Sequence, residues 1–163
     1  MVLSLIVAVD ENNGIGIQGN QPAFISADLK RFKSITQGNT VVMGRKTFEA
    51  LPNGALPNRR NIVLTRQPDF KAENCEVIRS PHTLEDICSA GEKVFVIGGG
   101  EIYGLFLSQA RFIYQTLIHH TFSEIDTWFP EISKEVWIVE TREGPFTDLK
   151  SGYSFSYLNW VKK

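Results

Sequence analysis

Short apolar runs alternate along the chain with amphipathic stretches, and this alternation predicts the order of the structural elements. The apolar runs are rich in Val, Ile and Phe, and they predict strands near 2–9, 40–43, 61–65, 75–79, 94–97 and 112–118. The amphipathic stretches predict helices near 26–36, 45–51, 81–90 and 101–108. Buried strands that alternate with helices are typical of a largely parallel sheet covered on both faces.

Two further features complete the predicted fold. Ser80 can cap the third helix, and Pro81 takes its first position, where a missing N–H costs nothing. After residue 120, strand-like VWIVETRE and YSFSYLNWVKK flank the turn-rich GPFTDLKSG, which predicts an antiparallel hairpin at one sheet edge. The predicted fold is α/β: a single domain over 1–163 with a mostly parallel twisted sheet of about eight strands, helices on both faces and a C-terminal antiparallel hairpin.

Composition narrows the classes of protein. A chain of 163 residues with 42% hydrophobic and 21% charged residues has the size and balance of one globular domain. A net charge of −1 argues against partners such as nucleic acid or a membrane surface, since both attract a basic excess. Cys75 and Cys88 match no metal-ligand spacing, so we expect no metal site and reduced thiols in a cytoplasmic protein. The opening MVLSLIVAV lacks a basic start, and we expect a buried strand rather than a signal peptide.

The segment DENNGIGIQGNQPAFI, residues 10–25, is the longest predicted loop near the amino end. It contains three glycines and a proline, but Ile15, Ile17, Phe24 and Ile25 are too apolar for a freely solvated loop. Long loops inside compact domains are often functional. We therefore expect a packed, mobile lid, with a disordered surface connection as the alternative.

Three strand-to-helix junctions carry glycines or cations. VFVIG runs into GGEIYGLF, where consecutive glycines let the backbone approach a phosphate, although a tight turn with close helix packing is the alternative. TVVMG leads into Arg45, Lys46 and Thr47; cations at a helix start oppose its dipole, so they indicate a bound anion or else solvated surface charges. NIVL ends at Thr65 and Arg66, and an Arg there suits a 2′-phosphate. Together they indicate a dinucleotide with an extra phosphate.

Asp28 lies at the head of a basic amphipathic helix in NQPAFISADLKRFK. One interpretation is dipole stabilisation or an i,i+3 pair with Arg31. The other follows from the helical stripe that Asp28 shares with Phe32 and Ile35, because a stripe facing the core turns the carboxylate inward. Burial there would raise the pKa of Asp28 and make it a candidate for acid–base chemistry.

Five segments in order, over nearly the whole chain, resemble the dihydrofolate reductase family. They are LIVAVDENNGIG, ADLKRFK, VVMGRKTFEAL with LPNRRNIVLTR, VFVIGGGEIY, and DTWFP near 126–130. The resemblance implies an NADPH-dependent oxidoreductase that reduces 7,8-dihydrofolate to tetrahydrofolate, with a hydride to C6 and a proton to N5. It also implies binding of antifolate inhibitors, a monomer and a cytoplasmic location.

The resemblance further implies roles for matching residues. Asp28 would be catalytic, hydrogen-bonding the pterin and promoting protonation of N5, with Thr116 bonded to the same group. Arg59 would pair two-pronged with the glutamate carboxylate of the substrate. The other residues implied to bind substrate are Ile6, Val7, Ala8, Leu29, Phe32, Leu51, Leu56 and Ile97. Those implied to bind NADPH are Ala8, Ile15, Gly16, Gly44, Arg45, Lys46, Thr47, Leu64, Thr65, Arg66, Ile97, Gly98, Gly99, Gly100, Glu101, Ile102 and Tyr103, with a cis peptide bond between Gly98 and Gly99.

The opening loop departs from the family pattern. Ala23 stands where the family usually has Trp, and Gln21 and Ser26 stand where an apolar residue and Pro are frequent. Either Phe24 swings into the space, or the pocket is larger and wetter. Two other functions stay open: a noncatalytic NADPH- or pterin-binding protein, and a related pterin or pyrimidine reductase. Arg59 favours a substrate with a carboxylate tail.

Overall fold

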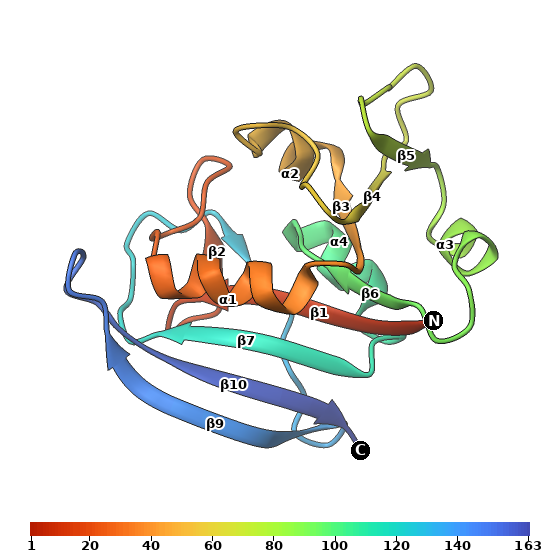
Figure 1. Ribbon diagram of the computed structural model, residues 1–163. Coiled ribbons are helices and arrows are strands. Elements are labelled where there is room, and N and C mark those ends of the chain that lie inside the picture. Colours follow the sequence, from red (N-terminus) through yellow and green to blue (C-terminus); the bar gives the residue numbers. More distant parts are fainter.

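An eight-stranded sheet surrounded by four helices forms the frame of the computed structural model, which describes residues 1–163 (Figure 1). The strands are β1 (Val2–Val9), β2 (Gly14–Gly16), β3 (Thr40–Gly44), β4 (Arg60–Leu64), β5 (Cys75–Ile78), β6 (Lys93–Val96), β7 (Phe112–Ile118), β8 (Thr127–Trp128), β9 (Trp137–Thr147) and β10 (Ser154–Lys162). The helices are α1 (Ser26–Thr36), α2 (Arg45–Ala50), α3 (Pro81–Ile87) and α4 (Gly100–Phe106). None of them has the length and hydropathy of a membrane-spanning helix.

The strand order is β5-β4-β3-β6-β1-β7-β10-β9. The strands from β5 to β7 pair in parallel, with β1 between β6 and β7. At the other edge β10 pairs antiparallel with both β7 and β9. The predicted parallel sheet with a C-terminal antiparallel hairpin is therefore confirmed.

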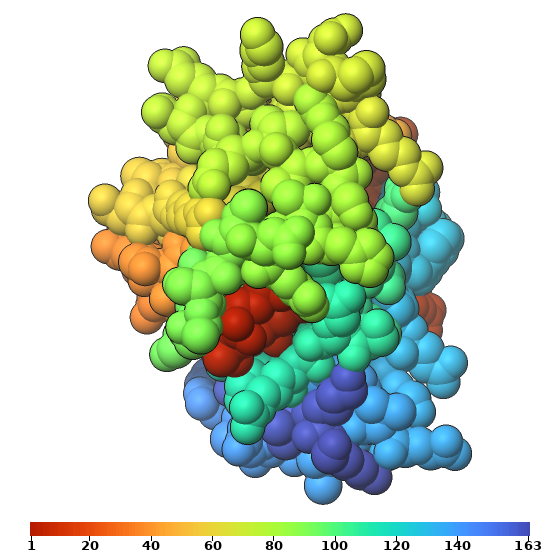
Figure 2. All heavy atoms as spheres, turned by 90° about the vertical axis from the view of Figure 1, so that its right-hand side faces the viewer, coloured from red at the N-terminus to blue at the C-terminus, as the bar shows by residue number.

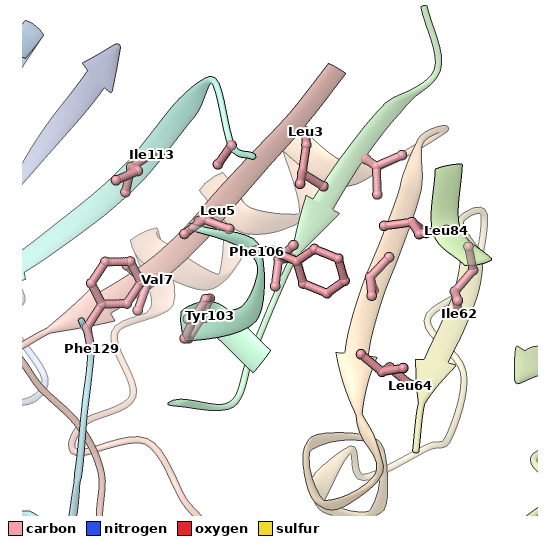
Figure 3. Close-up of a cluster of buried hydrophobic side chains, with 14 of the residues drawn as sticks. Leu3, Leu5, Val7, Ile62, Leu64, Leu84, Tyr103, Phe106, Ile113 and Phe129 are labelled. Atoms are coloured by element: carbon pink, nitrogen blue, oxygen red, sulfur yellow. The ribbon is translucent and has the colours of Figure 1, made fainter. Parts of the chain in front are cut away.

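Alternating side chains of β1 divide the core between the two faces of the sheet. Leu5 and Val7 pack on one face with Tyr103 and Phe106 of α4, as Figure 3 shows. Ile6 points to the other face, in a cluster against which side chains of α1 and α2 pack. Each fully buried aliphatic or aromatic side chain contributes about 1.5–3 kcal/mol to stability, so both helix layers are held mainly by this burial.

The loop over residues 10–25 is packed, as the sequence predicted. Its first residue, Asp10, is buried and accepts hydrogen bonds from the backbone N–H groups of Asn12 (2.9 Å) and Gly14 (2.7 Å) and from that of Phe122 (3.1 Å). β2, within the loop, pairs with β8, and Ile25 closes the loop in a cluster with Phe155 and other C-terminal residues. The predicted mobility of this lid stays a prediction.

Three details differ from the expected elements. β2 was missed, because a strand of three residues is too short to show an alternating pattern, whereas β8 lies within DTWFP, which resembles a later strand of the family. β9 extends to Thr147, through the Gly144–Pro145 pair that the sequence placed in the turn. Pro is tolerated there because β9 is an edge strand and its outer N–H groups need no partner. α3 ends at Ile87 rather than near 90, although the Ser80 hydroxyl caps its start as predicted.

At the amino ends of the strands, the first residues of β1 lie between the segments that lead into β6 and β7. Figure 2 shows this face, with the amino-terminal residues in red between green and teal segments.

A cluster of charged and polar side chains also lies at the amino ends of the strands. Arg60 of β4 binds Glu76 (Nε to Oε2, 2.6 Å) and Glu92 (Nη1 to Oε2, 2.9 Å), and the Thr40 hydroxyl also donates to Glu92 (2.6 Å). Burial raises the pKa of Glu92, but hydrogen bonds from Thr40, Ser89 and Arg60 outweigh it and lower the pKa to about 2. This cluster ties four neighbouring segments together.

We predict that Glu92→Gln lowers the free energy of unfolding by about 1–2 kcal/mol at neutral pH. A carboxylate whose folded pKa lies below its usual 4.5 stabilises the fold above that value and loses the effect as the pH falls toward 2. The difference from the unmodified protein should therefore shrink between about pH 5 and about pH 3 in urea denaturation. Glu73→Gln, at an exposed site, is the control. An equal loss at both pH values would contradict the assignment.

Candidate active site

The predicted junctions lie side by side at the carboxyl edge of the sheet. β4, β3 and β6 are neighbours, so the segments that follow Leu64, Gly44 and Val96 emerge together. The backbone N–H of Gly44 donates to the carbonyl of Gly98 (2.9 Å), which joins the ends of β3 and β6 directly. The sheet therefore brings the glycine turn and both cationic junctions into one region.

The glycine turn is built for close backbone approach. The Gly98–Gly99 peptide bond is cis, as the family resemblance implied, and Gly98 has φ of 128°, which residues with a side chain rarely adopt. A Cβ on Gly44 would lie 2.9 Å from Cγ1 of Ile102, and one on Gly100 would lie 2.8 Å from Cγ2 of Thr127. Gly44 and Gly100 are therefore required in part by close packing, which was the alternative interpretation of the glycine turn. Gly98 is buried and Gly99 is partly exposed beside α2, with the Thr47 side chain close to both.

The cations of the two junctions differ in how they are held. Arg45 pairs with Glu49 one turn along α2, whereas Lys46 is exposed and makes no ion pair. The Arg66 side chain is 91% exposed and has only a loose contact with Glu101, at 3.9 Å from Nη2 to Oε1. Arg66 and Lys46 therefore present nearly free positive charge at the edge of the sheet.

This donor set fits a phosphorylated dinucleotide. Hydroxyl groups accompany the cations: Thr47 lies in the first turn of α2, and a Cβ on Gly98 or on Gly99 would lie 3.5 Å from its Oγ1. Thr65 is buried and accepts a hydrogen bond from the N–H of Gln67 (3.2 Å). Cations, hydroxyls and the backbone of a glycine turn are the groups that hold phosphates.

Asp28 lies across β1 and β7 from the glycine turn, in the first turn of α1. Its Oδ1 accepts a hydrogen bond from the Thr116 hydroxyl at 2.5 Å, and Thr116 is only 2% exposed. Burial raises the pKa of Asp28 above its usual value, and the Thr116 hydrogen bond and the charge of Arg31 oppose this only in part. The inward orientation predicted from the helical stripe is therefore confirmed. Arg31 does not form the expected ion pair with Asp28, since it donates to Oδ1 of Asn159 (2.7 Å).

β1 connects the acid to the glycine turn. Ala8 of β1 is the register partner of Thr116, and the Tyr103 hydroxyl of α4 donates to the carbonyl of Ile6 (2.7 Å). Burial raises the pKa of Tyr103, so it stays a neutral donor. Val7 and Leu64 were also placed in the site by the resemblance, but both side chains lie in the larger hydrophobic core.

The other predicted substrate residues surround Phe32. Leu51, Leu56 and Ile97 pack with Phe32 around one hydrophobic cluster, while Leu29 is largely exposed at the rim. The guanidinium of Arg59 lies 6.0 Å from the centre of the Phe32 ring. These residues form an apolar wall with a cation at its outer end.

Asn61 is a residue that the sequence interpretation missed. Its buried amide donates to the carbonyls of Leu56 (2.9 Å) and Arg59 (3.0 Å) and accepts from the N–H of Leu56 (2.9 Å). These bonds fix the segment that carries both predicted substrate residues. A polar residue at the start of the apolar run NIVL was the available signal.

The loop reaches the glycine turn through Ile15, whose Cδ1 would lie 3.7 Å from a Cβ on Gly100. Gly16 pairs with Thr127 of β8, so the two predicted loop residues both lie at this end of the site. Phe24 is 65% exposed, and Ala23 packs against the cluster that contains Ile25. Phe24 therefore does not fill the space that Ala23 leaves. The larger, wetter pocket stays a prediction.

Known proteins resemble this chain in sequence and in fold. A family model described as dihydrofolate reductase matches residues 2–162. Dihydrofolate reductase of Bacillus subtilis (strain 168) is 41% identical over 162 residues, covering 99% of this chain and 95% of that protein. The enzyme of Staphylococcus haemolyticus is 37% identical over 155 residues, covering 95% and 92%. The solved structure of dihydrofolate reductase from Enterococcus faecalis, complexed with NADP(H) and RAB-propyl, is 36% identical, with a TM-score of 0.92 and coverage of 99% and 96%.

We predict that Asp28→Asn makes the ligand-free protein more stable at neutral pH, by about 0.5–1.5 kcal/mol. Asn keeps an oxygen for the Thr116 hydroxyl but removes the buried charge. Because burial raises the folded pKa of Asp28, the ionised form costs stability above that pKa, and the cost fades as the pH falls through it. Urea denaturation at about pH 7.5 and about pH 4 measures the effect, with Asp69→Asn at an exposed site as the control. Destabilisation at neutral pH would contradict it.

Proposed function

This chain belongs to the dihydrofolate reductase family, and from that premise we propose how its own residues carry out the NADPH-dependent reduction of 7,8-dihydrofolate to 5,6,7,8-tetrahydrofolate. The observation that supports this assignment of roles most directly is the position of Asp28. It is an inward-facing carboxylate with a raised pKa, held by Thr116 at the same sheet edge as the glycine turn. Perturbed acids beside a nucleotide-binding edge are characteristic of catalytic sites.

The cofactor would lie along the ends of β4, β3 and β6. Lys46, Thr47 and Arg66 would hold its phosphates, and the backbone from Gly98 to Gly100 would lie against its pyrophosphate. When bound there, NADPH supplies the hydride that reduces C6 of the substrate. Tyr103 fixes the distance between this turn and β1, because its hydroxyl is bonded to the carbonyl of Ile6.

Asp28 would govern the proton. The reaction consumes one proton for each hydride, and the proton reaches N5 of the pterin from water. An ionised carboxylate in a desolvated pocket favours positive charge on the pterin ring, and so favours protonation of N5. Thr116 holds the carboxylate in position and would bind the same edge of the pterin. The chain would otherwise align the two reactants and exclude water through the loop over 10–25.

Arg59 would bind the carboxylate tail of the substrate. Two of its N–H groups are used within the protein: Nε donates to the carbonyl of Pro57 (3.0 Å), and Nη1 donates to Oγ1 of Thr36 (3.1 Å). The other three of its five N–H groups stay free for a ligand. Leu51, Leu56 and Phe32 would contact the ring that joins the tail to the pterin. Binding of antifolate inhibitors, a monomeric state and a cytoplasmic location stay predictions.

We predict that purified protein oxidises NADPH when dihydrofolate is added, and that Asp28→Asn slows this turnover about 10²–10³-fold near neutral pH. The loss should be smaller at low pH, where the substrate can be protonated before the hydride arrives. The decrease in NADPH absorbance measures both, and Asp69→Asn should behave like the unmodified protein. Binding of NADPH without turnover would favour a noncatalytic binding protein, and unchanged kinetics in Asp28→Asn would remove Asp28 from the mechanism.

We also predict that Arg59→Lys raises KM for dihydrofolate about 10–100-fold with little change in kcat, because Lys cannot form a two-pronged pair. A pterin substrate that lacks the glutamate tail serves as the control, and its KM should be the same for both proteins. If KM for dihydrofolate does not change, Arg59 does not bind the tail.

A further inference from the structure

A second charged residue lies one helical turn beyond Asp28 on the same side of α1. The guanidinium of Arg31 is 4.1 Å from the centre of the Tyr157 ring, and its Nη2 donates to Oδ1 of Asn159 at 2.7 Å. Tyr157 and Asn159 are two residues apart on β10, so their side chains leave the same face of the strand. Arg31 is thus a half-buried cation held between α1 and the C-terminal hairpin.

The register of the sheet brings this cation close to the acid. Tyr157 is the partner of Thr116 across the β7–β10 pair, and Thr116 donates its hydroxyl to Asp28. The ring under the guanidinium and the hydrogen-bond donor of the carboxylate therefore lie on adjacent strands. Asp28 and Arg31, three residues apart, lie above them on one side of α1.

Both groups that hold Arg31 are uncharged, in contrast to the partners of the three arginines that form ion pairs. Arg45, Arg60 and Arg66 each contact a glutamate, so their charges are at least partly neutralised. Arg31 instead has an aromatic face and an amide oxygen, which bind a guanidinium without cancelling its charge. Its field therefore acts on the neighbouring carboxylate with little local compensation.

The other titratable groups around the pair do not replace this charge. They are Tyr103 of α4, Tyr114 of β7, Tyr157 of β10, and Glu140 and Glu143 of β9. Burial raises the pKa of all three tyrosines, so they stay neutral where the enzyme works. Glu140 and Glu143 are exposed on the edge strand, where solvent screens them. Arg31 is the permanent cation of this group.

We propose that Arg31 is a positioning residue that sets, through its charge, the pH range over which the site formed by Asp28 and the substrate takes up the proton of the reaction. This inference rests on the proposed function. The cation favours the ionised carboxylate and disfavours additional positive charge at N5 of the pterin. Both effects lower the proton affinity of the coupled pair. Arg31 thereby opposes burial and favours the ionised form of Asp28 before substrate binds.

The test is the pH dependence of the hydride-transfer rate, followed in a single turnover by loss of NADPH absorbance between about pH 5 and about pH 9. Arg31→Gln removes the charge but keeps a donor for Asn159. The pH at which the rate falls to half its plateau should then rise by about 0.5–1 unit. Arg31→Lys should leave this pH nearly unchanged. Lys30→Gln removes a charge from an exposed position of the same helix and should not move it.

A second variant tests the inference without removing Arg31. Asn159→Asp places a carboxylate on the guanidinium, which neutralises it in place, and should move the half-point upward by a smaller amount. The inference is wrong if Arg31→Gln and Asn159→Asp both reach half of the plateau rate at the same pH as the control Lys30→Gln, or at a lower pH. A lower plateau with an unmoved half-point would mean a purely structural role and would also overturn it.

The two levels of proposal can fail separately. If the unmodified protein does not turn over, or if Asp28→Asn leaves its pH profile unchanged, the proposed function fails. If turnover depends on Asp28 but the pH of half-maximal rate does not change when the charge of Arg31 is removed, only the inference about Arg31 fails.

Discussion

A carboxylate withdrawn from water destabilises a fold, and in this protein the hydrogen bond from Thr116 to Asp28 offsets part of that cost. That bond joins β7, a strand inside the sheet, to α1. It therefore holds the helix on the sheet and also orients the Asp28 carboxylate toward the carboxyl edge of the sheet. It satisfies one oxygen without neutralising the charge. The position of the acid therefore depends on how β7 pairs with β1, and not on α1 alone.

The strand order then distributes the chemistry along one edge. β4, β3 and β6 bring cations and the glycine turn to one side, while α1, bonded through Asp28 to Thr116 of β7, brings the acid to the other. Two hydrogen bonds link these halves to the sheet: Gly44 to Gly98, and Tyr103 to Ile6. In the proposed function, a hydride donor and a carboxylate that favours protonation would thus face one substrate from opposite sides, as reduction of a carbon–nitrogen double bond requires.

Local patterns in the sequence predicted what short-range physics decides. The apolar runs located every strand from β1 to β7 except the three-residue β2, and the stripe through Asp28, Phe32 and Ile35 predicted which way the acid points. Two features that were missed are local: β2 has only three residues, and Asn61 bonds to Leu56 and Arg59 within five positions. Another depends on contacts between distant segments. The binding of Arg31 by Asn159 joins α1 to a C-terminal strand 128 residues away. No local pattern encodes such contacts.

The absence of a side chain at Gly100 has a consequence for how this molecule can change over generations. A methyl group there would meet Cγ2 of Thr127 at 2.8 Å and the backbone oxygen of Trp128 at 3.2 Å, and β8 is the strand that holds β2. Enlarging position 100 would therefore displace the amino-terminal loop as well. A larger residue at position 100 is therefore compatible with the fold only if β8 and the loop change with it. Phe24, which is exposed, is not subject to this constraint.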